Sequence, residues 1–191
     1  MSGTRGVLQD SLRLLRRHAG TAYRASLIAT LVNTVPDVLR QLLVWDDPRV
    51  STALLVDVVG FGTALAAQLW VTGALADLPA GGRLRTPGAL RRGARTAWHA
   101  VRRGPGTVVA GVAAGGAVSA LLTVPASVAA LGLPRVVGPL DGPGVGAFTV
   151  ATLSDLVASA VTLPFLALVL VLVATGRRPA TRGLTAPGPG Q

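Results

Sequence analysis

Long apolar stretches alternate with short arginine-rich segments along almost the whole chain. A helix needs about 20 apolar residues to cross a hydrocarbon core of about 30 Å. Three stretches meet this requirement, from Ala53 to Ala76, from Gly104 to Pro134 and from Val145 to Thr175. The pattern predicts a membrane-spanning helix in each of them.

An earlier stretch, from Ala25 to Trp45, is the weakest of four candidate spans. Only the 12 residues from Ala25 to Pro36 are uncharged, and Asp37 and Arg40 follow them. Because 12 helical residues rise only about 18 Å, the span has to continue to Trp45 and hold both charges in its outer third. We expect a first span here. For the two charged residues, the favoured interpretation is that the span ends early and leaves both in the outer interface.

Two further segments, residues 4–24 and 87–103, combine many arginines with apolar residues at helical spacing. Helices of this kind lie along a membrane surface with their apolar face in the lipid. We expect one amphipathic helix in each segment, the second with Pro87 in its first turn. The apolar positions are Val7, Leu8, Leu12, Leu15 and Ala19 in the first segment, and Leu90, Ala94, Ala97, Trp98 and Val101 in the second.

The composition fits a membrane protein better than a soluble domain. Half of the 191 residues are hydrophobic and only 14% are charged, whereas charged residues make up about a quarter of a typical soluble domain. We therefore expect an all-α, polytopic membrane protein with four transmembrane helices and two amphipathic helices on the cytoplasmic face. Residues 1–178 are expected to form a single membrane domain, and the Pro- and Gly-rich residues 179–191 a disordered tail.

The arginines predict the orientation in the membrane. Fifteen of the 18 lie in the N-terminal segment, in residues 80–105 and in the C-terminal tail. Because cytoplasmic segments carry an excess of basic residues, both termini and residues 80–105 are expected in the cytoplasm. All basic residues are arginine and all acidic residues are aspartate, which indicates a GC-rich bacterial genome and the bacterial cytoplasmic (inner) membrane. A twin-arginine signal at Arg16-Arg17 is disfavoured, because no convincing cleavage pattern follows and three further spans do.

The two halves of the chain, residues 5–83 and 88–178, resemble each other. Both halves begin in the cytoplasm, so they would form parallel repeats related by an axis along the membrane normal. The alternative is chance similarity between segments rich in Ala, Val, Leu and Arg. The matching segments are Arg16-Arg17-His18-Ala19-Gly20-Thr21 with Arg102-Arg103-Gly104-Pro105-Gly106-Thr107, Val35-Pro36 with Val124-Pro125, and Leu55-Val56-Asp57-Val58-Val59 with Leu153-Ser154-Asp155-Leu156-Val157.

A basic amphipathic helix followed by two spans, repeated once, is similar to the membrane domain of the glycerophosphodiester-phosphodiesterase type and to related uncharacterised bacterial multi-span membrane families. The resemblance covers most of residues 5–178. In such proteins the membrane domain can be joined to a soluble catalytic domain. The resemblance therefore implies a membrane module and carries over no catalytic residue.

Four charged residues are candidates for a polar path through the membrane. Asp37 and Arg40 lie three residues apart, so they share a helix face and can pair. Ionisable side chains inside a span often mark a functional path. Asp57 and Asp155 hold matching positions near the outer ends of the second and fourth spans. A cation or proton site is one interpretation of these two aspartates, and capping of the helix N-termini is the favoured one.

Little in the sequence indicates an enzyme, a metal site or a cofactor. There is no cysteine, and His18 and His99 each lie in an arginine-rich segment without a second ligand type nearby. A net charge of +10 would fit a nucleic-acid partner, but the arginines form blocks between apolar spans with few aromatic residues among them. Gly111 and Gly115 give the third span a small-residue face suited to close helix packing, within the monomer or across a homodimer.

The basic amphipathic helices provide the leading functional hypothesis. Each arginine near an anionic leaflet contributes on the order of 1 kcal/mol to membrane association. Arg91, Arg92, Arg95, Arg102 and Arg103 are therefore candidate ligands for lipid headgroups. We expect a non-enzymatic module that contacts anionic lipids or a partner membrane protein. The alternative is a small transporter or channel subunit with a polar path near the four charged residues named above.

Overall fold

The computed structural model describes residues 2–44, 49–131 and 145–176, without the side chains at 2, 36, 37, 39–44, 50, 52, 53, 56, 57 and 131. The described part of the chain is helical and contains no strand, which confirms the all-α prediction. Its elements are α1 (Ser2–Arg17), α2 (Ala19–Val44), α3 (Val50–Ala74), the short 3-10 helix η1 (Leu78–Ala80), α4 (Ala89–Arg103), α5 (Pro105–Leu131) and α7 (Val145–Thr175).

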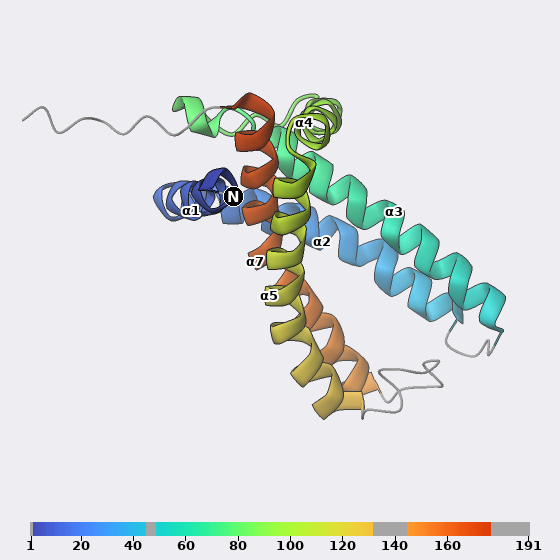
Figure 1. Cartoon of the computed structure of the whole chain (residues 1–191). Coiled ribbons are helices and arrows are strands. Elements are labelled where there is room, and N and C mark those ends of the chain that lie inside the picture. The colour runs from blue at the N-terminus through green and yellow to red at the C-terminus, as the bar shows by residue number, and fades with distance from the viewer. Residues whose placement is uncertain (1, 45–48, 132–144, 177–191) are drawn as a thin grey trace, which may run out of the picture.

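The long helices form two antiparallel pairs, α2 with α3 and α5 with α7. Figure 1 shows the two pairs diverging from a common end, where the shorter helices α1 and α4 lie. Three segments are long and apolar enough to cross a membrane: Val58–Ala80, Pro105–Ala130 and Val145–Thr175. The prediction of membrane-spanning helices in these three regions is therefore confirmed at the level of length and composition.

The boundary between the first amphipathic helix and the first long helix differs from the prediction. The amphipathic helix ends at Arg17 and α2 begins at Ala19, so Arg24 lies within the long helix. Helical hydrogen bonding continues across the junction, since the backbone N–H of Ala22 donates to the carbonyl of His18 at 2.9 Å. Because the helical hydrogen bonds continue, no proline or glycine is needed at this junction. The sequence therefore has no local marker that would have located it at His18.

The expected start of the second amphipathic helix at Pro87 is wrong. Gly88 precedes α4 in the left-handed conformation, with φ of +65°, and α4 begins at Ala89. A left-handed residue interrupts an α-helix, and glycine adopts this conformation without steric cost. Pro87 therefore belongs to the turn that leads into α4.

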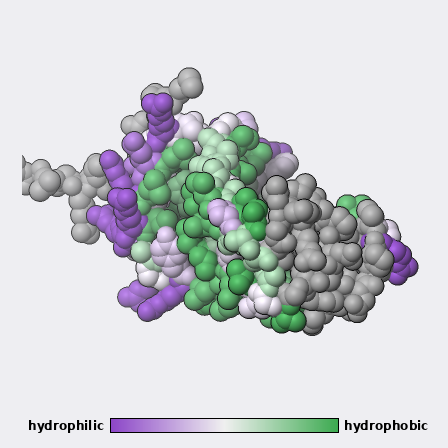
Figure 2. Space-filling view, turned by 90° about the horizontal axis from the view of Figure 1, so that it is seen from below, coloured by the Kyte–Doolittle hydropathy of each residue, from purple (hydrophilic) through white to green (hydrophobic). Residues whose placement is uncertain are grey.

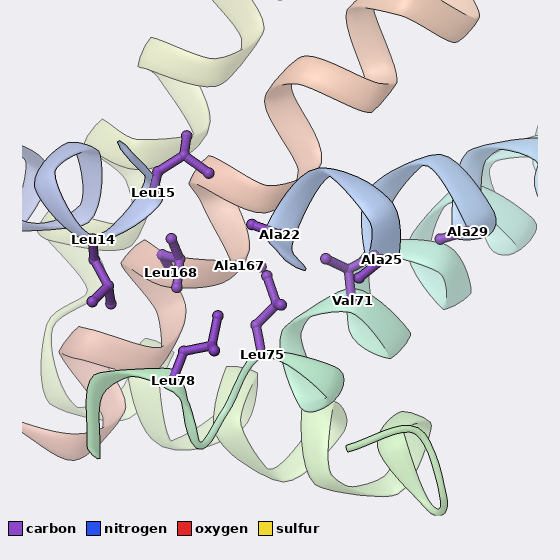
Figure 3. Packing of buried hydrophobic residues seen from close by; sticks show 10 residues of the cluster. All are labelled: Leu14, Leu15, Ala22, Ala25, Ala29, Val71, Leu75, Leu78, Ala167 and Leu168. Carbon is purple, nitrogen blue, oxygen red and sulfur yellow. The ribbon is translucent and has the colours of Figure 1, made fainter. Parts of the chain in front are cut away.

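The buried core lies at the end where α1, α2, α3, η1 and α7 meet (Figure 3). Leu75, which follows the last residue of α3, and Leu168 of α7 are fully buried there, and Leu14 and Leu15 of α1 join them. Small side chains on α2, such as Ala22, contribute to the same cluster. In lipid, helices associate through close packing rather than through removal of apolar area from water, so small residues at such contacts favour association.

The backbones of α3 and α4 cross at very short distance, and a glycine of each helix lies at the crossing. A Cβ added to Gly93 would lie 1.7 Å from the carbonyl oxygen of Leu69, and one added to Gly73 would lie 1.8 Å from that of Ala89. No side chain can occupy either position unless the backbones move apart. These two glycines therefore fix α4 against the C-terminal end of α3.

The α5–α7 pair packs through Gly111, as the small-residue pattern predicted. A Cβ on Gly111 would lie 2.8 Å from a methyl group of Val169, whereas one on Gly115 would meet nothing within 4 Å. Gly111 thus serves packing within one chain. A homodimer contact on α5, which the sequence left open, would have to use the rest of the helix surface.

Large apolar side chains cover the outside of the long helices away from the core. Phe61 of α3 is 73% exposed and Leu121 of α5 is 75% exposed. Figure 2, viewed from the end opposite α1 and α4, shows hydrophobic residues across the centre of the molecule and hydrophilic ones gathered at its edge. Apolar exposure on this scale is costly in water and favourable in a bilayer, which agrees with membrane-spanning helices.

Candidate functional site

Helix α4 has three distinct sides, and the first holds it to the bundle. Ala89, Gly93 and Ala100 are buried on this side. They lie four and seven residues apart, so they form one stripe along the helix. Small residues in this stripe allow α4 to contact both α3 and α7. The helix is therefore a fixed part of the fold rather than a loosely attached segment.

The second side of α4 is apolar and uncovered. Leu90 and Val101 lie on it, Trp98 lies on the edge that it shares with the arginines, and all three are about half exposed. An apolar helix side next to an arginine-rich one is typical of helices that lie in the interfacial region of a membrane. Trp98 suits that position, because tryptophan rings are enriched at the level of the lipid headgroups.

The third side of α4 carries exposed arginines. Arg91, Arg95 and Arg102 lie on it at spacings of four and seven residues, and all three are exposed. The guanidinium carbon of Arg102 lies 4.4 Å from the centroid of the Trp98 ring, within the range of a cation–π contact. This contact orients Arg102 along the edge between the apolar side and the charged side. The structure thus brings three of the five predicted headgroup ligands onto one surface, which we call the α4 arginine face.

The other two predicted headgroup ligands bond to backbone carbonyls. Arg92 donates from Nε to the carbonyl of Gly73 at 3.3 Å, and its terminal nitrogens donate to the carbonyls of Pro87 and Arg85. Arg103 donates to the carbonyl of Ala174, near the end of α7. The guanidinium group has several donors in a fixed fork, so one arginine can hold several carbonyls at once. Arg92 therefore fastens the turn before α4, and Arg103 fastens α4 to the end of α7.

Helix α1 differs from α4 even though both have an amphipathic sequence. Most of its apolar side is covered: Leu14 and Leu15 lie in the core, and Val7 and Leu8 are half-buried. Among its large apolar residues, Leu12 is the exposed one. The protein itself therefore covers the apolar side of α1, whereas that of α4 is left open.

The structure places the four candidate polar-path residues on three helices and does not join them into one described site. Asp37 and Arg40 lie inside α2, which continues past them to Val44, and their side chains, like that of Asp57, lie outside the described residues. Asp155 lies on α7 and is exposed. The prediction that Asp57 and Asp155 cap helix N-termini is wrong. Helix α3 begins at Val50 and α7 at Val145, seven and ten residues earlier.

Buried polar contacts between the long helices were missed by the sequence reasoning. Ser26 of α2 is fully buried, and its hydroxyl donates to the carbonyl of Ala160 in α7 at 2.8 Å. In an α-helix that carbonyl would accept the N–H of residue 164, but Pro164 has none. Ser26 therefore satisfies the carbonyl that Pro164 leaves without a partner from its own helix. The available signal was a proline inside one span and a serine inside another, since serine commonly fills this role in membranes.

A groove opens on the side of the α2–α3 pair next to α4, with a volume of 440 Å³. Its walls come from α2 and α3, and Leu90 of α4 lies at one end. The lining is almost entirely apolar, with Asn33 and Thr63 as the polar residues. No periodicity in one helix can reveal this groove, because it forms between two helices and depends on how they pack.

Comparisons of this chain with protein-family models, with curated proteins and with solved structures find no match. The resemblance to the glycerophosphodiester-phosphodiesterase type of membrane domain therefore stays a prediction from the helix pattern.

Proposed function

We propose that the protein is a non-enzymatic membrane module that binds anionic phospholipid headgroups at the cytoplasmic surface through the α4 arginine face. The observation that carries this proposal is the pair of uncovered sides on α4. One is apolar and the other holds Arg91, Arg95 and Arg102, on a helix that the bundle holds rigidly. An apolar side and a cationic side on one rigid helix suit the boundary between acyl chains and phosphate groups.

The module crosses the membrane four times in this proposal, with α2 as the fourth crossing. Helix α2 has 26 residues, which corresponds to about 39 Å. It runs antiparallel beside α3, one of the three helices whose length and composition suit a membrane span. A helix of this length packed along a membrane-spanning neighbour crosses with it. Buried polar atoms such as the Ser26 hydroxyl then face protein rather than lipid.

The internal duplication is part of the same proposal. Each half has a short basic helix followed by two long helices in the same order. Helix α1 contacts α7, and α4 contacts α3, so each short helix packs on the last long helix of the other half. This reciprocal pattern is what two parallel repeats would produce. It supports placing α1 and α4 on the same side of the membrane, the cytoplasmic side according to the arginine distribution.

Cysteine labelling tests the topology directly, because the chain has no cysteine of its own. Gln9→Cys, Ser51→Cys and Arg95→Cys would each be expressed in cells and treated with a membrane-impermeant maleimide before and after permeabilisation. We expect position 51 to react in intact cells and positions 9 and 95 to react only after permeabilisation. If α2 does not cross, position 9 will react on the same side as position 51 and opposite to position 95.

Lipid retention tests the binding proposal. The protein is purified from a membrane containing equal amounts of phosphatidylglycerol and phosphatidylcholine, and bound lipids are counted by native mass spectrometry. We expect phosphatidylglycerol to be retained several-fold over phosphatidylcholine, and the triple variant Arg91→Gln, Arg95→Gln, Arg102→Gln to lose this preference. A matched variant with three arginines of α1 replaced (Arg5, Arg13 and Arg17 to Gln) has the same change in charge. Equal retention in both triple variants would show that net charge, and not the α4 arginine face, selects the lipid.

A further inference from the structure

We infer that the groove between α2 and α3 holds one acyl chain of an anionic phospholipid, whose headgroup is bound by arginines at the end of the groove next to α4. The inference rests on the proposed function, since it names the place where one lipid of that class sits. The groove is part of the described surface and is formed by helices that pack along each other, so its shape is set by the fold.

The lining of the groove suits a hydrocarbon chain and little else. Ile28 and Val32 line it from α2, Ala66 and Trp70 from α3, and Leu90 from α4. The two polar residues lie toward the end remote from α4, and the hydroxyl of Thr63 donates to the carbonyl of Gly60 in its own helix. A volume of 440 Å³ is within the range of about 300–1,000 Å³ that small-molecule pockets occupy. An apolar ligand of chain-like shape is therefore the chemical match.

Charge at one end of the groove selects the headgroup. Arg24 precedes Ile28 by one helical turn, on the same face of α2, and it is exposed. Arg91 follows Leu90 directly and is also exposed. Two cations from different helices thus flank the end of the groove that lies nearest to the predicted cytoplasmic surface. A phosphate with no compensating cation of its own complements this pair, whereas a zwitterionic headgroup brings a competing positive charge.

The depth of the groove decides which part of the lipid to probe. Trp70 lies four residues before the end of α3, about 6 Å along the helix from its last residue. The ring of Trp70 therefore faces the part of a bound acyl chain that lies nearest to the headgroup. Bromine atoms on carbons 6 and 7 of an acyl chain quench tryptophan fluorescence on contact, so Trp70 can report on occupancy of the groove.

The experiment uses a single-tryptophan protein in bilayers of phosphatidylcholine. Trp45 and Trp98 are replaced by phenylalanine, and brominated phosphatidylglycerol or brominated phosphatidylcholine is added at equal, low mole fractions. We expect brominated phosphatidylglycerol to quench Trp70 at least two-fold more strongly. Ala66→Phe, which fills the groove from an exposed position of its lining, is expected to abolish that difference. Ala64→Phe, two residues away on the same helix and outside the lining, is the matched control and is expected to keep it.

Equal quenching by the two lipids, or a difference that Ala66→Phe leaves intact, would overturn the inference, because the groove would then contact ordinary bilayer lipid. A second protein that keeps only Trp98 separates this result from failure of the proposed function. If Trp98 shows a preference for brominated phosphatidylglycerol and Trp70 does not, the α4 arginine face binds anionic lipid and the groove does not. If neither tryptophan shows a preference, both the groove inference and the proposed function are wrong.

Discussion

Replacing Ser26 by alanine tests a specific hydrogen bond between the two helix pairs. The Ser26 hydroxyl donates to the carbonyl of Ala160, whose helical donor is missing because residue 164 is proline. Ser26 and Pro164 are both buried, so water does not replace the lost donor. Ser26→Ala therefore leaves this part-buried carbonyl without its donor and removes a link between α2 and α7.

The expected loss follows from the cost of an unsatisfied polar group and from measured interhelical hydrogen bonds. Hydrogen bonds between membrane helices contribute about 0.6 kcal/mol on average and up to about 1.7 kcal/mol. A buried polar group left without a partner costs about 1–3 kcal/mol. We expect Ser26→Ala to lower the free energy of unfolding by about 1–2 kcal/mol. Pro164→Ala restores a backbone N–H that bonds the Ala160 carbonyl, so in that background Ser26→Ala should cost less than about 0.5 kcal/mol.

The assay is reversible unfolding in mixed micelles with increasing mole fractions of SDS, followed by far-UV circular dichroism. The parent protein, both single variants and the double variant form a double-mutant cycle. Ser154→Ala is the matched control, because the Ser154 hydroxyl bonds the carbonyl of Ala151 in its own helix at 3.0 Å. If Ser26→Ala costs the same with and without Pro164, the hydroxyl does not compensate for the proline and the reasoning is refuted.

Three further predictions concern α4 and the polar candidates. Gly93→Ala should lower the free energy of unfolding by about 1–3 kcal/mol, because the new methyl group would overlap a carbonyl of α3. Gly116→Ala, which meets nothing within 4 Å, should leave it unchanged or raise it in the same SDS titration. Arg92→Gln should speed tryptic cleavage in residues 81–88, because three carbonyl contacts are lost, whereas Arg91→Gln should not; equal cleavage rates would contradict this assignment. Asp155→Asn should leave ion flux through proteoliposomes unchanged, and a loss of flux would favour the transporter alternative.

The long helices could be predicted from the sequence because each depends on the composition of a single stretch. Helix α7 occupies residues 145–175 as predicted, and α5 begins within one residue of its predicted start at Gly104. An uninterrupted apolar stretch has to form a helix in lipid, since every backbone polar group must be satisfied within the segment. The boundaries of α5 and α7 were therefore accurate, whereas the start of α4, predicted at Pro87, and the junction at His18, which keeps its hydrogen bonds, were not.

The candidate site could be predicted only in part. The sequence indicated five arginines on one amphipathic helix, but it could not separate Arg92 and Arg103, which bond to carbonyls of other segments, from the three on the α4 arginine face. The distinction depends on where the ends of α3 and α7 lie relative to α4. In the same way, the sequence does not distinguish Gly93 from the other small residues. Only the 1.7 Å between a Cβ added to Gly93 and the carbonyl oxygen of Leu69 shows that two backbones cross there.

By itself the sequence determined that the chain is helical, that it has apolar helices long enough for a membrane and that its arginines are gathered in blocks between them. These properties follow from local composition, because hydrogen bonding and burial in lipid act on each segment separately. The tertiary structure decided that α1 buries its apolar side while α4 leaves its own side open, that Ser26 meets the carbonyl freed by Pro164, and that a groove lies between α2 and α3. Each of these features needs two or more helices in a defined position, and no single helix encodes that position.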